Sequence, residues 1–399
     1  METFKKNILF YAVQYYFPLD LVHIRKFQKN IKWNIVSENS NIRWSKALIS
    51  EFAPLWDWRS LSKNPGIVWD KDLIEPFTSR LNWLSLSLSV SLPWSMDLLK
   101  QFEEFWHWDL ISSNPSVPWS TNLLKQLEEF WRWKSIAGNT GIPWTEENMN
   151  IVRKCAEDAN EVDVLWQIRA ENPALPWSQD FLTEAIRQNE DQVFFWSNLS
   201  RNPALPWSIE LIERYKEKWD WTYLALNEGL PWTEELIDKY WHVFKENEHY
   251  LSLAANPALP WTLELIAKYE NQWDWGDDGF SNNEGLPWSA ELIDKYVTRW
   301  SWPYLPCNPA IPWTEDLIER YFFYLSGSGK PEWGNFFSAF LVNEGFPWSM
   351  DLLDRFVSWP GDLTVTKPEL FGRNRRLWLD VFKPLVTDDV LHEVLNQGD

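Results

Sequence analysis

Apolar side chains recur along the chain in a unit of about 25 residues that is marked by a Trp. The first five of these Trp residues are 25 residues apart, and seven more follow at looser spacing. They are Trp44, Trp69, Trp94, Trp119, Trp144, Trp177, Trp207, Trp232, Trp261, Trp288, Trp313 and Trp348. When each unit is numbered from its Trp as position 0, Leu or Ile usually occupies +4 and +5, and Tyr or Phe usually occupies +8. These positions share one stripe of an α-helix, so the pattern predicts a helix packed on its neighbours.

A residue that can cap a helix directly follows every one of these Trp residues. Position +1 is Ser or Thr in eleven units and Asp70 in the twelfth. A short side-chain oxygen there can accept a hydrogen bond from an unpaired amide of the first helical turn. We therefore expect the first helix of each unit, helix A, to start at this cap. We also expect the Trp to pack on the residue at +5 as a hydrophobic staple.

A second, shorter element is predicted upstream of each Trp. An aromatic residue stands at −11, Leu or a similar residue at −8, and Asn at −5 in eleven units, with Ser89 as the exception. Asn tolerates left-handed backbone and bonds to its own neighbouring amides, so it suits the end of a short helix. We expect this element B to be a one- or two-turn α or 3₁₀ helix.

The run Asn202-Pro203-Ala204-Leu205-Pro206, followed by a capped helix, a turn and a second short helix, resembles the leucine-rich repeat variant family. The resemblance covers nearly the whole chain and implies α and 3₁₀ helices alternating in a right-handed superhelix. It implies no particular activity. The Trp residues at 0, +12 and +14 depart from the family pattern, and the cysteine-bound iron–sulfur cluster of one member has no counterpart here.

We therefore predict an all-α tandem-repeat solenoid of about 13 short two-helix units. Its turns read Asn-Pro-x-Leu-Pro-Trp-Ser/Thr, and a degenerate unit around Leu19 and Asp20 precedes Trp44. Terminal units must shield the core face that they would otherwise expose. The predicted domains are an N-terminal capping unit at 1–43, a twelve-unit Trp-rich solenoid at 44–356 and a C-terminal cap at 357–399.

The net charge of −20 belongs entirely to the later units. Residues 1–140 carry 16 Lys/Arg and 14 Asp/Glu, whereas the remainder carries 21 against 43. Pairs four residues apart on helix A, such as Glu235/Lys239 and Asp316/Arg320, each contribute roughly 0.2–0.5 kcal/mol but cancel in net charge. Much of the excess lies in the insertions that lengthen some units between helix A and element B.

In a tandem array one kind of loop lies along one edge, so we expect these insertions to form an acidic rim. The rim residues are Glu157, Asp158, Glu161, Glu190, Asp191, Glu246, Glu248, Asp277 and Asp278. The simpler explanation, that polar loops keep a Trp-rich protein in solution, stays open.

No motif predicts catalysis or metal binding. His242 and His249 match no zinc spacing, and the sequence 326–330 is followed by Pro331 where a phosphate-binding loop needs Ser or Thr. The acids Asp274, Asp277 and Asp278 lack the alternating spacing of an EF-hand. We expect no catalytic residue, no metal site and no cofactor.

Composition restricts the cellular setting and the partners. No apolar run is long enough to span a bilayer, and residues 7–17 only faintly resemble a signal peptide because no small-residue cleavage site follows. Cys155 and Cys307 cannot make a disulfide framework. The acidic charge disfavours nucleic acid. We expect a cytoplasmic protein with neither membrane nor nucleic acid as a partner.

The function that these features favour is a non-enzymatic binding scaffold for protein–protein interaction, with a basic segment of the partner on the acidic rim. The alternative is a carbohydrate or small-cation binder that uses exposed Trp side chains.

Overall fold

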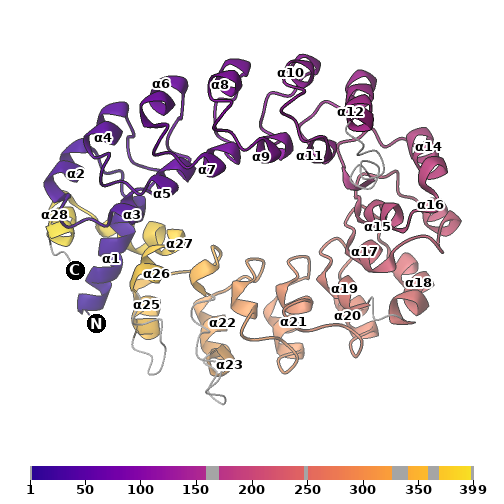
Figure 1. Cartoon of the computed structure of the whole chain (residues 1–399). Coiled ribbons are helices and arrows are strands. Elements are labelled where there is room, and N and C mark those ends of the chain that lie inside the picture. Colours follow the sequence, from indigo (N-terminus) through magenta and orange to yellow (C-terminus); the bar gives the residue numbers. More distant parts are fainter. Residues whose placement is uncertain (1, 159–169, 247–249, 326–339, 358–367, 397–399) are drawn as a thin grey trace. The chain divides into compact units, whose positions relative to one another are not determined.

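The computed structural model describes residues 2–158, 170–246, 250–325, 340–357 and 368–396. Every regular element within these ranges is a helix, so the prediction of an all-α chain is confirmed (Figure 1). The α-helices are α1 (Glu2–Tyr16), α2 (Leu21–Phe27), α3 (Trp33–Val36), α4 (Lys46–Glu51), α5 (Trp58–Lys63), α6 (Lys71–Ile74), α7 (Trp83–Ser87), α8 (Met96–Gln101), α9 (Trp108–Ser113), α10 (Thr121–Gln126), α11 (Trp133–Ala137), α12 (Glu146–Asp158), α14 (Gln179–Asn189), α15 (Val193–Arg201), α16 (Ile209–Arg214), α17 (Trp221–Leu226), α18 (Glu234–Glu246), α19 (Tyr250–Ala255), α20 (Leu263–Lys268), α21 (Ala290–Lys295), α22 (Glu315–Arg320), α23 (Phe322–Leu325), α25 (Met350–Val357), α26 (Pro368–Gly372), α27 (Arg375–Leu377) and α28 (Asp388–Asn396). The 3₁₀ helices are η1 (Glu75–Phe77), η2 (Phe280–Asn282), η3 (Leu305–Cys307) and η7 (Lys383–Leu385), and η6 (Trp378–Phe382) is a π-helix.

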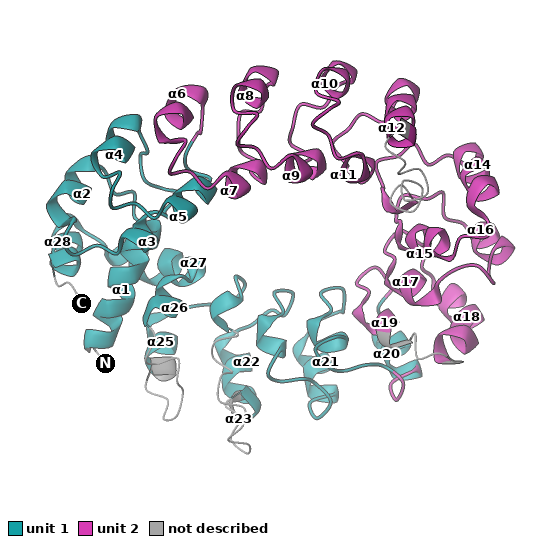
Figure 2. Cartoon of the chain, viewed as in Figure 1, with its two compact units in different colours: residues 1–67, 261–268, 273–399 teal, residues 68–260, 269–272 magenta. Residues whose placement is uncertain are grey.

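The helices gather into two compact units (Figure 2). Unit 1 comprises residues 1–67, 261–268 and 273–399, and unit 2 comprises residues 68–260 and 269–272. Within unit 2, consecutive B helices pack on one another, as α9 does on α7 and α11, and α17 on α15 and α19.

Helix A begins where the capping residues predict. All twelve side chains at +1 accept a hydrogen bond from the backbone N–H three residues later, at 2.9–3.3 Å. This prediction is confirmed. Helix A has six residues in most of the 25-residue units, and it reaches thirteen in α12 and α18, which belong to longer units.

The Asn at −5 ends element B, but not in the left-handed conformation that we expected. At Asn64, Asn227 and Asn308, for example, φ is −68°, −78° and −71°. The eleven Asn side chains are all buried, with no more than 4% of their surface exposed. A surface turn would not require that burial, so the Asn has a second role.

That role is a ladder of hydrogen bonds between successive units. The side-chain nitrogen of Asn227 donates to the carbonyls of Ser200 and Asn202 in the preceding unit, at 2.8 and 3.2 Å. Its side-chain oxygen accepts from the amide of Gly229 at 2.8 Å. An amide nitrogen has two hydrogens, so this arrangement uses both donors and leaves two buried carbonyls satisfied. The same pair of bonds recurs at Asn64, Asn114, Asn139, Asn172, Asn202, Asn256, Asn308 and Asn343.

A serine at −7 forms a second link between units. It is present where the Trp at position 0 is followed by the next Trp of the series after 25 residues. The hydroxyls of Ser37, Ser87, Ser112, Ser200 and Ser281 accept from the backbone N–H that precedes the next B element, at 2.8–3.1 Å. Each of these serines precedes a 25-residue unit, as does Ser62. Longer units are preceded instead by Ala137, Ala170, Ala225, Ala254 and Pro306. The serine therefore occurs only where the next B element follows at the 25-residue spacing.

The Trp side chains form the apolar counterpart of these ladders. The indole N–H of Trp232 donates to the carbonyl of Asn227 at 2.8 Å, and seven other Trp residues at position 0 bond in the same way at 2.8–3.0 Å. The ring at 0 lies 4.9–5.2 Å from the Trp at +12 in six units. That second ring in turn meets the Trp at −11 of the same unit edge to face, as in Trp196 and Trp219 at 5.0 Å. Such pairs contribute about 0.5–1.5 kcal/mol beyond burial of their area.

The two ends of the chain pack on each other within unit 1. Helix α1 lies against α26 and also contacts α28 and η6. Phe4 meets Phe371 edge to face at 5.8 Å, and a Cβ at Gly372 would lie 2.5 Å from the Tyr11 side chain. Lys6 pairs with Glu393 at 2.9 Å. The core faces of the two predicted caps therefore cover each other.

Candidate interaction surface

The acidic insertion residues that the structure describes lie on exposed turns and helix ends. In unit 2, Glu157 lies near the end of α12, and Glu190 and Asp191 form the turn between α14 and α15. In unit 1, Asp277 and Asp278 lie in the turn before η2, and both are exposed. Glu161 and Glu248 lie outside the described residues, and Asp158 and Glu246 are described only as the last residues of α12 and α18. One acidic rim along the whole array therefore stays a prediction.

A surface hollow of about 310 Å³ lies beside Glu190 and Asp191 in unit 2. The turn between α14 and α15 contributes to its lining, and so do residues 217–220, which belong to the repeat numbered from Trp207. Glu217 and Asp220 add two carboxylates to those of Glu190 and Asp191, and Lys218 is the one basic residue of the lining. The Lys218 side-chain nitrogen donates to the carbonyl of Glu190 at 3.4 Å. Four acids against one base make the hollow acidic.

Local hydrogen bonds hold the wall of this hollow in place. Asp220 caps α17 by accepting from the amide of Thr222 at 3.2 Å, and its other oxygen accepts from the Ser197 hydroxyl at 2.9 Å. The Trp196 indole N–H donates to the carbonyl of Glu190 at 2.9 Å. The backbone on both sides is thus tied to helices α15 and α17.

Two apolar side chains are exposed at the start of α15, and the first of them, Val193, lines the same hollow. Val193 is 76% exposed and Phe194 is 71% exposed, whereas the next residue, Phe195, is fully buried. The repeat pattern does not include this pair, which lies at −14 and −13 from Trp207. The available signal was position: both residues precede the −11 Trp196, where shorter units have only the turn.

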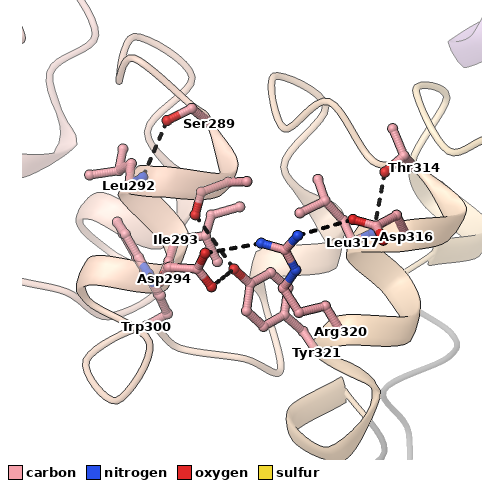
Figure 3. A network of polar contacts seen from close by, with 11 residues as sticks. Ser289, Leu292, Ile293, Asp294, Trp300, Thr314, Asp316, Leu317, Arg320 and Tyr321 are labelled. Atoms are coloured by element: carbon pink, nitrogen blue, oxygen red, sulfur yellow. Dashed lines mark hydrogen bonds and ion pairs between the residues drawn. The ribbon is translucent and has the colours of Figure 1, made fainter.

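A row of tyrosines and acids joins consecutive A helices and is structural. The Tyr321 hydroxyl donates to Asp294 of the preceding unit, and Arg320 bonds both Asp294 and Asp316, at 3.0 and 3.1 Å (Figure 3). Burial and the Asp294 carboxylate raise the pKa of Tyr321 to about 12. The predicted pair Asp316/Arg320 is therefore present, and it extends to a neighbouring unit.

The same row in unit 2 departs from the predicted pairing. Lys239 pairs with Glu213 of the preceding unit at 2.5 Å, although Glu235 stands four residues before it. The Tyr240 hydroxyl donates to the same carboxylate at 2.6 Å, and burial together with this bond raises the pKa of Tyr240. Raised tyrosine pKa values here follow from packing between units.

Tyr296 interrupts the row in unit 1. Its side chain is buried, and its hydroxyl has no hydrogen-bond partner in the part of the chain that the structure describes. The residue six positions after Trp261, where Asp294 and Glu213 stand in their own units, is Ala267. The acid that would accept from the hydroxyl is absent from the sequence.

No Trp side chain within the described ranges is fully exposed. Every Trp there is buried or partly buried, and most of the indole N–H groups donate to backbone carbonyls. Packing thus accounts for the Trp excess. The alternative of a carbohydrate or small-cation binder finds no exposed Trp to carry it in this part of the chain.

Candidate metal and catalytic chemistry is also weak in the described part of the chain. No group of three His, Cys, Asp or Glu residues there could hold a metal ion. Asp274 uses its side chain to accept from the amide of Gly276 at 2.8 Å, as turn residues do. Burial raises the pKa of the Cys307 thiol, which lowers its thiolate fraction. The sequence 326–330 and His249 lie outside the described residues.

Among the helices that are described, none has the length and apolarity needed to cross a bilayer. Comparison with protein-family models, curated proteins and solved structures finds no match to this chain.

Proposed function

We propose that the chain is an α-helical solenoid of about 13 two-helix units that acts as a non-enzymatic scaffold for a protein partner. The contacts that recur between units support the architecture, because the Asn at −5 bonds carbonyls of the preceding unit in the same way along the chain. Arrays of this kind present long surfaces to which proteins bind. The proposed setting is the cytoplasm.

The observation that carries the proposal is the acidic hollow beside α15. Glu190, Asp191 and Glu217 are exposed, and within the described part of the chain the one ion pair that they make is the long contact between Glu217 and Lys216, at 4.0 Å. A basic segment of a partner would meet a negative potential there, which steers association and makes it sensitive to salt. The proposed contact on the partner is therefore rich in Lys or Arg.

The test compares partner capture by two charge variants of the full chain. Glu190→Gln, Asp191→Asn and Glu217→Gln together neutralise the hollow, while Asp220 is left intact because it caps α17. The matched control carries Glu103→Gln, Glu104→Gln and Glu128→Gln, which remove three exposed acids elsewhere in unit 2.

Proteins captured from a cell lysate at low and at high salt are identified by mass spectrometry. At low salt, we expect the wild type and the control variant to capture a set of basic partners that the hollow variant does not capture. At high salt, we expect all three proteins to lose these partners. Exposed charges contribute little to stability, so both variants should fold as the wild type does. Equal capture by all three proteins at every salt concentration would show that the hollow is only a solubilising surface.

A further inference from the structure

The helix that borders the acidic hollow has an additional turn that the shorter units lack. Helices α5, α9 and α17 begin at the −11 Trp, whereas α15 begins three residues earlier, at Val193. Phe195 in that turn is buried, and Val193 and Phe194 point to solvent. The insertion thus adds two exposed apolar side chains, Val193 and Phe194, as well as the two acids Glu190 and Asp191.

Nothing in the described part of the chain covers Val193 and Phe194. Phe194 makes no ring contact there, in contrast to the exposed Phe105, which stacks on Trp83 at 4.8 Å. Val193 lines the hollow together with the four carboxylates. Phe194, the next residue of α15, is not part of the lining, so Val193 is the residue that joins the apolar pair to the acids.

We propose that this surface, made by Val193 and Phe194 with Glu190, Asp191 and Glu217, docks a partner segment in which an apolar side chain is flanked by Lys or Arg. The inference rests on the proposed function and specifies its ligand. The apolar side chain would lie against Phe194, and the flanking cations would reach the carboxylates. The partner's apolar side chain would be buried against the apolar pair, and its Lys or Arg neighbours would pair with the carboxylates.

Charge complementarity selects this occupant over the others. A second copy of the chain would bring a net charge of −20 to an acidic surface, and like charges across an interface are unfavourable. Phosphate-bearing ligands meet the same repulsion. A basic and apolar protein segment is the class that both features attract.

Two synthetic peptides of equal length and charge provide the probes. One alternates Arg with Leu, and the other alternates Arg with Ser; both carry a fluorescent label, and binding to the full chain is measured by anisotropy. We expect the Arg/Leu peptide to bind about tenfold more tightly than the Arg/Ser peptide, as one buried apolar side chain provides.

Three variants separate the two halves of the proposal. Phe194→Ser should remove the advantage of the Arg/Leu peptide and leave Arg/Ser binding unchanged, whereas the neutralised hollow should weaken both. Val22→Ser is the matched control, because Val22 is 69% exposed on α2 beside basic residues and should change neither. Circular dichroism checks that each variant folds.

The outcomes distinguish this inference from the proposed function. If neutralising the hollow weakens both peptides but Phe194→Ser affects neither, the acidic scaffold stands and docking at α15 is overturned. If no variant changes binding of either peptide, both proposals fail. A dimer that Phe194→Ser dissociates would identify a second copy as the occupant and would also overturn the inference.

Discussion

Replacing Asn227 by Asp tests whether the asparagine ladder holds neighbouring units together. The change keeps the shape and the oxygen that accepts from Gly229, but it places a second oxygen against the carbonyls of Ser200 and Asn202. Two buried hydrogen bonds are lost. The Ser200 carbonyl loses a partner at a cost of about 1–3 kcal/mol, whereas the Asn202 carbonyl still accepts from the Trp207 indole N–H. With the penalty for a buried carboxylate, we expect Asn227→Asp to lower the free energy of unfolding by roughly 3–6 kcal/mol at neutral pH.

The destabilisation should depend on pH in one direction. Burial between two carbonyls would raise the pKa of the introduced carboxyl above its value in the unfolded chain. The penalty is therefore fully developed at neutral pH and shrinks as the pH falls towards 4, where the protonated acid can donate one of the two lost bonds. The comparison is the difference in unfolding free energy between variant and wild type at each pH.

Urea denaturation followed by Trp fluorescence measures this difference, and hydrogen exchange with mass spectrometry locates it. Amides of α15 and α17 should lose protection first. Asn34→Asp is the control, because Asn34 is exposed on α3 and should change stability by no more than about 0.5 kcal/mol. If Asn227→Asp costs no more than this control at neutral pH, the ladder does not stabilise the array.

Three further predictions test other contacts. Tyr240→Phe should cost about 1–2 kcal/mol because it removes a hydrogen bond to a carboxylate, whereas Tyr296→Phe should cost nothing because its hydroxyl has no partner among the described residues; equal losses in urea denaturation would contradict the tyrosine row. Trp232→Ala should cost about 3–5 kcal/mol as a core truncation, and Thr233→Ala about 1 kcal/mol as a lost cap; an unchanged melting curve for the Trp variant would show that the ring does not pack. Replacing both cysteines by Ser should leave the fold intact, and a reducing agent should not move the wild-type melting temperature; a large shift would reveal a disulfide.

The features that the sequence predicted well are those set by local geometry. Helix A starts at each cap because a side-chain oxygen and an amide three residues later are brought together by the first turn alone. Most of the Trp residues are buried as predicted, and indole N–H groups at position 0 bond the carbonyl at −5, a partner that the staple pattern does not specify. The proposed contact of Trp232 with Ile237 stays a prediction.

The features that were missed connect units to one another. The Asn at −5 was assigned to a local turn, while its two donors reach residues 25 and 27 positions earlier. The serine at −7 could have been found from the sequence, since it is present only before 25-residue units. The exposure of Val193 and Phe194 could not be recognised from hydrophobicity, because an apolar residue has the same hydrophobicity whether it is buried or exposed. The three-dimensional position of α15 is needed to tell the two apart.

The packing of helix α1 on the C-terminal helices affects how the protein is made. Lys6 and Glu393 are 387 residues apart, so a ribosome has released almost the whole chain before α1 meets its partners. Until residues 368–396 emerge, the face of α1 that carries Phe4 and Tyr11 stays open to solvent and to chaperones. A chain that lacks α26 and α28 lacks the contacts that cover this face of α1, and exposed apolar surface of this kind favours aggregation.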